Sequence, residues 1–295
     1  MADLFDLFES LESQTKAPPK NREGIIRAPF AYPGSKMRSV RHILPKLPVY
    51  DAYVEPFGGS GVILLNRPPV KLEVLNDRYM GVVAFYRCLA SSAKLEQLVE
   101  RIEYTVCARE DFQFCKETWR DCTDDIERAF RWYYTIVNSF GGLSRNFGRA
   151  TGSNTTAGKL REKIPHLRKV HERLKKVYIE NQDWRTCIKD YDSLNTVFYI
   201  DPPYLESSAG VYKSEMSQAE HSELLDTVHS CEGFCAVSAY PNALYDSYPW
   251  DEVIDWEVFV SIKSQAYTDT NGKESFKGIE DRNHRTERLY IKESK

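Results

Sequence analysis

The residues with the clearest chemical potential in this chain are Asp201-Pro202-Pro203-Tyr204. They follow a short apolar run, Val197-Phe198-Tyr199-Ile200, that is typical of a buried strand. Two consecutive prolines continue neither a strand ladder nor a regular helix, so they fix an extended exit from the strand. A carboxylate, a carbonyl and an aromatic ring are therefore expected together at a sheet edge that binds ligands in open α/β folds. Taken alone, the segment is more typical of a surface turn than of a site.

A second segment that suits ligand binding is Glu55-Pro56-Phe57-Gly58-Gly59-Ser60-Gly61. It follows a predicted strand at 52–55 and precedes a predicted helix at 62–65, and its glycines allow a ligand to approach the backbone closely. The spacing is not G-x-G-x-x-G, which argues against a nicotinamide cofactor. The alternative is an ordinary turn between a strand and a helix.

Two aspartates follow further predicted strands. Asp77 ends the strand at 72–75, where it could accept hydrogen bonds from two ribose hydroxyls. Asp183 follows the strand at 177–180 and could accept a hydrogen bond from an adenine amino group. Each could instead be the N-cap of the helix that follows it.

Composition sets the limits for these interpretations. The chain has 295 residues, 42% of them hydrophobic and 28% charged, which is typical of a globular protein. No apolar run approaches the ~18 residues of a membrane span, so we expect no membrane association. The seven cysteines are scattered and odd in number, which indicates free thiols and a cytoplasmic location. The six histidines lack metal-ligand spacing, so we expect no metal.

Positive charge is concentrated in two blocks although the net charge is −3. Residues 16–46 hold eight Lys and Arg against one acid, and residues 141–176 hold ten against two. Such blocks favour a partner with a phosphate backbone, although a solvated surface is the alternative.

The pattern of elements predicts an α/β fold. Further strands are predicted at 196–200 and 234–238, with a closing antiparallel pair at 253–262 and 286–292. Between them, helical patterns dominate residues 90–175, at 94–103, 109–119, 125–138 and 161–175. We therefore expect a mobile tail at 1–27, a cofactor-binding catalytic domain formed by 28–89 and 176–295, and a mainly helical insert at 90–175.

The order of these motifs resembles that of the Dam-type (alpha-group) DNA adenine-N6 methyltransferases. The resemblance rests on Pro33-Gly34-Ser35-Lys36, the glycine segment, Asn76-Asp77 and Asp201-Pro202-Pro203-Tyr204, and it extends from about residue 29 to Ile291. It implies a Rossmann-like methyltransferase sheet, mostly parallel with a C-terminal antiparallel hairpin. The helical insert would then be a DNA-recognition domain.

The resemblance also implies S-adenosylmethionine as methyl donor and S-adenosylhomocysteine as product. Lys36 would face the carboxylate of the donor, Asp77 its ribose and Asp183 its adenine. The full set of residues implied to bind the donor is Tyr32, Pro33, Gly34, Lys36, Glu55, Pro56, Phe57, Gly59, Gly61, Asp77, Asp183, Trp184 and Asp201.

The catalytic residues implied by the resemblance are Asp201, Pro202, Pro203 and Tyr204. An exocyclic adenine amine is a poor nucleophile, because its lone pair is delocalised into the ring. Asp201 and the carbonyl of Pro202 can both accept hydrogen bonds from this amine and align it with the methyl group. Tyr204 would stack on the adenine after the base is flipped out of the duplex.

The insert contains Asn138-Ser139-Phe140-Gly141-Gly142-Leu143-Ser144-Arg145-Asn146, which resembles the DNA-entering hairpin of the family. By this match Leu143 would wedge between bases and Arg145 would contact a base edge. The residues assigned to DNA binding are Leu143, Ser144, Arg145, Asn146, Arg149 and Lys159. The segment that follows departs from the family pattern, so it does not predict the recognition sequence.

Other interpretations stay open at this point. Ser in place of Asp201 is usual in cytosine-N4 enzymes and Asn in protein-glutamine enzymes, so Asp favours adenine in DNA, or less readily in RNA. A catalytically silent nucleic-acid-binding homologue is the alternative from another class. We expect a monomer of bacterial, phage or mobile-element type acting on double-stranded DNA. A short amphipathic helix at 3–12 could pack on the body or bind a protein partner.

Overall fold

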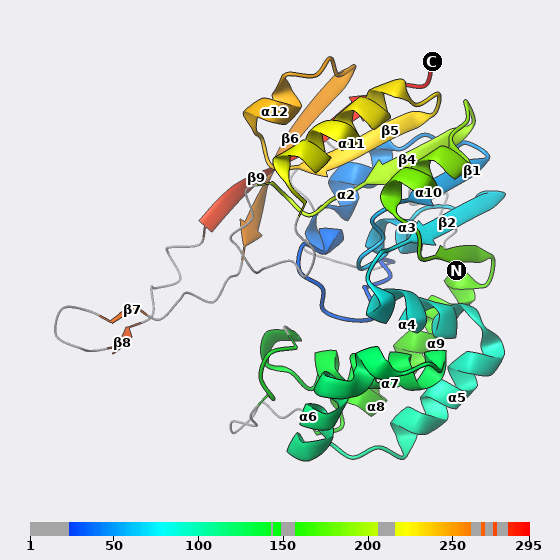
Figure 1. The fold of residues 1–295 in the computed structure, drawn as a ribbon, viewed down its shortest axis with the longest axis vertical. Coiled ribbons are helices and arrows are strands. Elements are labelled where there is room, and N and C mark those ends of the chain that lie inside the picture. The colour runs from blue at the N-terminus through cyan, green and yellow to red at the C-terminus, as the bar shows by residue number, and fades with distance from the viewer. Residues whose placement is uncertain are drawn as a thin grey trace.

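A seven-stranded sheet with strand order β3-β2-β1-β4-β5-β9-β6 forms the centre of the protein (Figure 1). The strands are β1 (Ala52–Glu55), β2 (Leu72–Asn76), β3 (Val177–Glu180), β4 (Thr196–Ile200), β5 (Phe234–Ala239), β6 (Glu252–Val260) and β9 (Asn283–Lys292). Strands β1 to β5 run parallel to one another. Strand β9 runs antiparallel to both β5 and β6. The predicted mostly parallel sheet with a C-terminal antiparallel pair is confirmed.

This computed structural model describes residues 24–142, 144–148, 157–205, 216–260, 267–268, 274–275 and 283–295. A separate two-stranded sheet pairs β7 (Tyr267–Thr268) with β8 (Glu274–Ser275). The predicted helix at 3–12 lies outside the described residues, as do Leu143 and Arg149.

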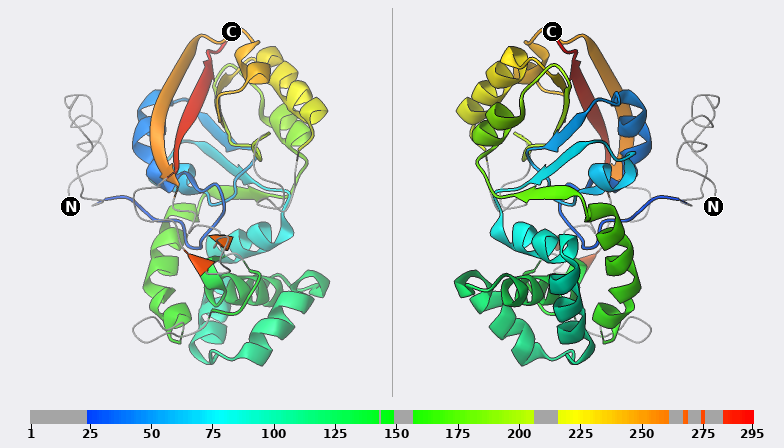
Figure 2. Two further views of the ribbon diagram at one scale, coloured as in Figure 1. Left: turned by 90° about the vertical axis from the view of Figure 1, so that its left-hand side faces the viewer. Right: turned by 90° about the vertical axis from the view of Figure 1, so that its right-hand side faces the viewer.

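Helices cover both faces of the seven-stranded sheet (Figure 2). One face packs against α10 (Trp184–Tyr191), α11 (Gln218–Ser230) and α12 (Ala243–Asp246). The other face packs against α2 (Val40–Ile43), α3 (Val62–Asn66) and α4 (Met80–Ala90). Every residue of β1, β4 and β5 is buried, because parallel strands covered on both faces leave no side exposed to water.

The chain between β2 and β3 is helical and lies below the sheet in Figure 1. After α4 come α5 (Ser92–Glu103), α6 (Arg109–Thr118), α7 (Asp125–Val137), α8 (Lys159–Glu162) and α9 (Ile164–Leu174). Short 3₁₀ turns are η1 (Lys36–Arg38), η2 (Leu44–Lys46), η3 (Trp119–Asp121) and η4 (Phe140–Gly142). One continuous apolar core joins these helices to the sheet, so the insert shares its core with the rest of the protein. The division into a catalytic domain and a recognition domain stays a prediction.

Two local expectations differ from the structure. The single helix predicted at 161–175 is divided into α8 and α9, because Pro165 at the start of α9 has no N–H to continue the earlier turn. The Tyr-Pro-Gly turn in the sequence also predicts a helix capped near Ser35, but the Ser35 side chain caps no helix, and its Oγ lies 3.0 Å from Oγ of Ser60 instead. This contact ties the Pro-Gly turn to the glycine segment.

Candidate active site

A cleft opens at the carboxyl ends of β1, β2 and β4. It encloses about 1020 Å³ of space, which includes open solvent at its mouth. Residues from every predicted motif of the sheet domain line it: Tyr32, Pro33, Gly34, Lys36, Glu55, Pro56, Phe57, Gly59, Asp77, Trp184, Asp201, Pro202 and Pro203. The structure therefore brings together segments that lie up to about 170 residues apart in the sequence.

Asp201 leaves the end of β4 and points at Lys36 from the Pro-Gly turn. The Lys36 ammonium lies 2.8 Å from Oδ1 of Asp201 and donates to the carbonyl of Gly34 at 2.9 Å. The side chains are 4% and 19% exposed. Burial raises the pKa of Asp201 to about 6, although Lys36 opposes the rise. At neutral pH the carboxylate is mainly ionised and can accept hydrogen bonds.

Tyr204, three residues after Asp201, is not among the residues that line the cleft. Tyr204 is 5% exposed, and its ring makes an edge contact with Tyr240 at 4.5 Å between ring centroids. Its hydroxyl donates to Oε2 of Glu287 on β9 at 2.7 Å, and the Lys36 ammonium lies 4.7 Å from its ring centroid. Stacking of a base on that face of the ring would require the ammonium to move. The stacking role of Tyr204 stays a prediction.

Glu55 ends β1 with a buried carboxyl group that reaches the cleft. Its Oε1 accepts hydrogen bonds from the Tyr53 hydroxyl at 2.8 Å and from the Leu64 N–H at 2.7 Å. Burial raises the pKa of Glu55 to about 8, in spite of both donors. This carboxyl is therefore mainly protonated at neutral pH and differs from Asp201 in its charge.

The glycine segment wraps around the end of β2. Gly59 and Gly61 have φ values of +47° and +60°, which residues with a Cβ rarely adopt. A Cβ on Gly59 would lie 3.1 Å from the Tyr32 ring, so the segment and the Pro-Gly turn meet closely here. Gly61 lies outside the residues that line the cleft, and it shapes the turn.

Asp77 accepts a hydrogen bond on each carboxylate oxygen, from Gly59 N–H and from Tyr79 N–H, both at 2.7 Å. Burial raises its pKa, and these donors lower it. Because a carboxylate has about four acceptor positions, Asp77 keeps capacity for a hydroxyl donor in the cleft.

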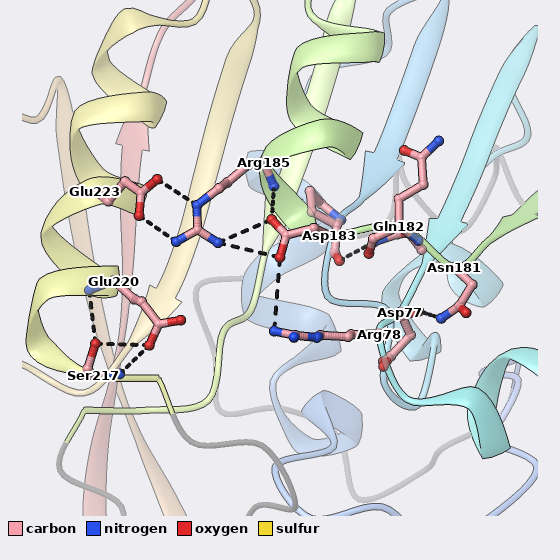
Figure 3. A network of polar contacts seen from close by, with 11 residues as sticks. Asp77, Arg78, Asn181, Gln182, Asp183, Arg185, Ser217, Glu220 and Glu223 are labelled. Atoms are coloured by element: carbon pink, nitrogen blue, oxygen red, sulfur yellow. Dashed lines mark hydrogen bonds and ion pairs between the residues drawn. The ribbon is translucent and has the colours of Figure 1, made fainter. Parts of the chain in front are cut away.

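Asp183 is the N-cap of α10, and its Oδ1 accepts from Arg185 N–H at 3.0 Å. Figure 3 shows how the Arg185 guanidinium lies between Asp183 and Glu223 of α11. Asp183 does not line the cleft, whereas the next residue, Trp184, does. The helix-cap alternative is thus realised, and a role for Asp183 toward adenine stays a prediction.

The hairpin of the insert is closed by a bridge between Ser139 and Phe147 and by a 2.8 Å hydrogen bond from Phe140 N–H to the Asn146 carbonyl. Ser144 has a positive φ of 58°, and its N–H donates to Oγ of Ser139 at 2.9 Å. Arg145 and Asn146 are exposed. Lys116 donates to the Arg145 carbonyl at 2.8 Å, and Lys159 begins α8. The hairpin residues are therefore grouped, and their contact with DNA stays a prediction.

Several residues of the cleft were not singled out from the sequence. Tyr199, Ser60, Arg78, Met216 and Glu220 also line it. Their types carry no distinctive signal, although alternation in β4 places Tyr199 on the same face as Asp201.

Asn76 belongs to a motif that carries the family resemblance, but sequence reasoning gave it no role of its own. It is buried, and its side chain donates to the carbonyls of Pro56 and Gln182 at 2.8 and 3.1 Å. It also accepts from Gln182 N–H at 2.8 Å. Asn76 thereby joins the ends of β1, β2 and β3 under the cleft. Its position beside Asp77 was the only signal in the sequence.

No cluster of three His, Cys, Asp or Glu side chains that could hold a metal ion is present in the described ranges. None of the helices among the described residues has the length and apolar character needed to cross a membrane.

The sheet, the glycine segment and the Asp-Pro-Pro-Tyr strand end together define a Rossmann-like methyltransferase fold. The family described as D12 class N6 adenine-specific DNA methyltransferase matches residues 32–266, and the chain belongs to this family. The chain is also similar to modification methylase LlaI of Lactococcus lactis subsp. lactis, with 24% identity over 198 residues. The match covers 62% of this chain and 30% of that protein, so the chain spans less than a third of its relative. The resemblance seen in the motifs is confirmed at the level of the family.

Proposed function

We propose that the protein transfers a methyl group from S-adenosylmethionine to the exocyclic N6 of a flipped adenine in double-stranded DNA. The observation that carries this proposal is that Asp201 and Pro202, consecutive residues with a carboxylate and a carbonyl to offer, both line the cleft. Together with membership of the adenine-specific family, this pair of acceptors favours an amino group as the target. The proposal includes modification of DNA as the biological role, as the name of the relative indicates for that protein.

The cleft residues fit the methyl donor chemically. Gly59 presents backbone without a side chain, and Phe57 and Trp184 provide flat apolar surfaces 6.2 Å apart between ring centroids. Asp77 retains acceptor positions for a ribose, and Lys36 offers a cation for a carboxylate. When bound, S-adenosylmethionine supplies an electrophilic methyl group on a positively charged sulfur.

Asp201 and Pro202 act on the target amine. Each accepts one N–H of the amine, which favours a nitrogen whose lone pair points into the cleft and stabilises the positive charge that develops on it. Asp201 must be ionised to do this, and Lys36 favours that form. Asp201 need not remove a proton in the same step.

The partner of the hairpin is the DNA duplex. Arg145 is exposed on a hairpin whose backbone is fixed by several hydrogen bonds, which supports its assignment to a base edge. Tyr204 contacts the flipped base once the Lys36 ammonium has moved from its ring. Recognition and chemistry are thus assigned to different parts of the chain.

The test is the Asp201→Ala variant in a single-turnover methylation assay on duplex oligonucleotides. The rate should fall by at least about 10³-fold, because alignment and charge stabilisation are both lost. Binding of S-adenosylhomocysteine, measured by calorimetry, should stay within a few-fold of the parent. A variant that keeps its turnover would remove Asp201 from the mechanism.

A further inference from the structure

His221 is a buried histidine for which the proposed reaction has no use. It lies in the first turn of α11 and is 0% exposed. Its Nδ1 is 2.8 Å from the hydroxyl of Tyr245, which is also buried. Within the described ranges, Nε2 has no hydrogen bond of ordinary geometry. A buried polar nitrogen without such a bond is costly, so its position requires an explanation.

The carbonyl of Pro203 is close enough to act on the ring of His221. The carbonyl of Pro203 favours the protonated ring and raises the pKa of His221, whereas burial lowers this pKa by more, so the ring is neutral. A carbonyl can only accept and Nδ1 already faces the Tyr245 hydroxyl, so the tautomer with its proton on Nε2 suits both neighbours. Nδ1 then accepts from the hydroxyl of Tyr245. In this structure Nε2 makes no hydrogen bond of ordinary geometry with that carbonyl.

Pro202 and Pro203 have a particular need for an external donor. Neither residue has an N–H, so the segment cannot be fixed through backbone donors of its own. Only its carbonyls can be held. Pro203 lines the cleft together with Met216 and Glu220 from the start of α11, so this helix is its neighbour in space. Fixing the Pro203 carbonyl restrains the peptide unit next to the carbonyl of Pro202.

We propose that His221 is a positioning residue for methyl transfer: supported by Tyr245, it donates Nε2–H to the carbonyl of Pro203 and thereby orients the carbonyl of Pro202 toward the target amine. This inference rests on the proposed function, because the Pro202 carbonyl acquires its role from that function. His221 itself touches neither the donor nor the base.

The test compares His221→Leu, which removes both ring nitrogens, with His221→Gln, whose amide can donate from nearly the position of Nε2. His221→Leu should lower the single-turnover rate by about 10–100-fold, as expected for a small misplacement of a reacting group. The affinities for S-adenosylhomocysteine and for DNA should each stay within about 3-fold of the parent. In free energy this limit is less than half of the 1.4 kcal/mol that a tenfold change in affinity represents. His221→Gln should restore most of the lost rate.

The matched control is His171→Leu, which removes another buried histidine. His171 contacts the Leu89 carbonyl and the Ser92 hydroxyl, far from the cleft lining. We expect His171→Leu to lose about as much thermal stability as His221→Leu and to keep the parent rate of methyl transfer. If His221→Leu turned over at the parent rate, or if His221→Gln failed to restore activity, the inference would be overturned.

A second measurement does not depend on activity. Two-bond ¹H–¹⁵N correlation spectra should show the Nε2–H tautomer for His221, and the Nδ1–H tautomer would contradict the inference. Activity of the parent protein is measured first. Absence of methyl transfer by the parent would contradict the proposed function, whereas an active parent with an unaffected His221→Leu variant would contradict only the inference about His221.

Discussion

Replacing Lys36 by Met should shift the pH dependence of methyl transfer toward higher pH. The Lys36 ammonium lies 2.8 Å from the Asp201 carboxylate and is 4% exposed, so water screens the pair weakly. It opposes the effect of burial on the pKa of Asp201, which is about 6 in the presence of Lys36. Because only ionised Asp201 can accept from the target amine, the rate should follow the ionised fraction of this carboxyl.

The size of the change follows from the geometry. An opposite charge at this distance lowers the pKa of a carboxyl by about 1–3, so its removal should raise the pKa of Asp201 to about 7–9. At pH 7 the ionised fraction would fall from about 90% to between about 50% and 1%, a loss in rate of about 2- to 100-fold. At a pH above the raised pKa of Asp201, the rate of the variant should approach that of the parent.

The assay is single-turnover methylation at saturating donor and DNA from pH 5.5 to about 9.5, a range that brackets both pKa values. The matched control is Lys46→Met, which removes the surface ion pair with Glu252 and should leave the midpoint unchanged. A rate that falls by the same factor at every pH, with an unmoved midpoint, would refute the assignment of Lys36 to the ionisation of Asp201.

Three further predictions concern the donor, the DNA and the fold. Gly59→Ala should weaken binding of S-adenosylhomocysteine by about 5- to 30-fold in calorimetry, because the positive φ costs about 1–2 kcal/mol and the new Cβ meets Tyr32; unchanged affinity would argue against this loop as the donor site. Arg145→Ala should reduce discrimination between target and altered sequences by about 10-fold or more without affecting donor affinity; intact discrimination would remove the hairpin from sequence recognition. Arg173→Met should lower the free energy of unfolding in urea by about 3–5 kcal/mol, because it leaves the carboxylate of Glu73 buried without its partner at 2.6 Å; a change below about 1 kcal/mol would show that the pair is not needed for stability.

The sequence predicted the sheet and most of the cleft because both depend on local signals. Buried runs such as 196–200 indicate strands, and the residues that follow them meet at one edge of a parallel sheet. This is why Asp77 and Asp201 could be grouped before the structure was known, whereas Lys36 was joined to them only by the family resemblance. Asp183 shows the limit of the approach, because an acid after a strand has the same local pattern as a ligand and as a helix cap.

Contacts between distant segments were beyond reach of the sequence. The hydrogen bond between Tyr204 and Glu287 joins residues 83 apart, and the contact of Arg185 with Glu223 joins residues 38 apart. Neither pair has a spacing that a helix or strand period would reveal. His221 was not singled out for the same reason. In the sequence it is an ordinary histidine near the start of a predicted helix, and its neighbours Tyr245 and Pro203 come from other segments of the chain.

The most direct measurement of the central claim is the identity of the methylated nucleoside. Double-stranded plasmid DNA would be incubated with the protein and S-adenosylmethionine, digested to nucleosides and analysed by mass spectrometry, with Asp201→Ala as the paired control. The account predicts N6-methyladenine with the parent protein and its absence with the variant. N4-methylcytosine alone, or no methylated nucleoside from a folded protein that binds the donor, would contradict it.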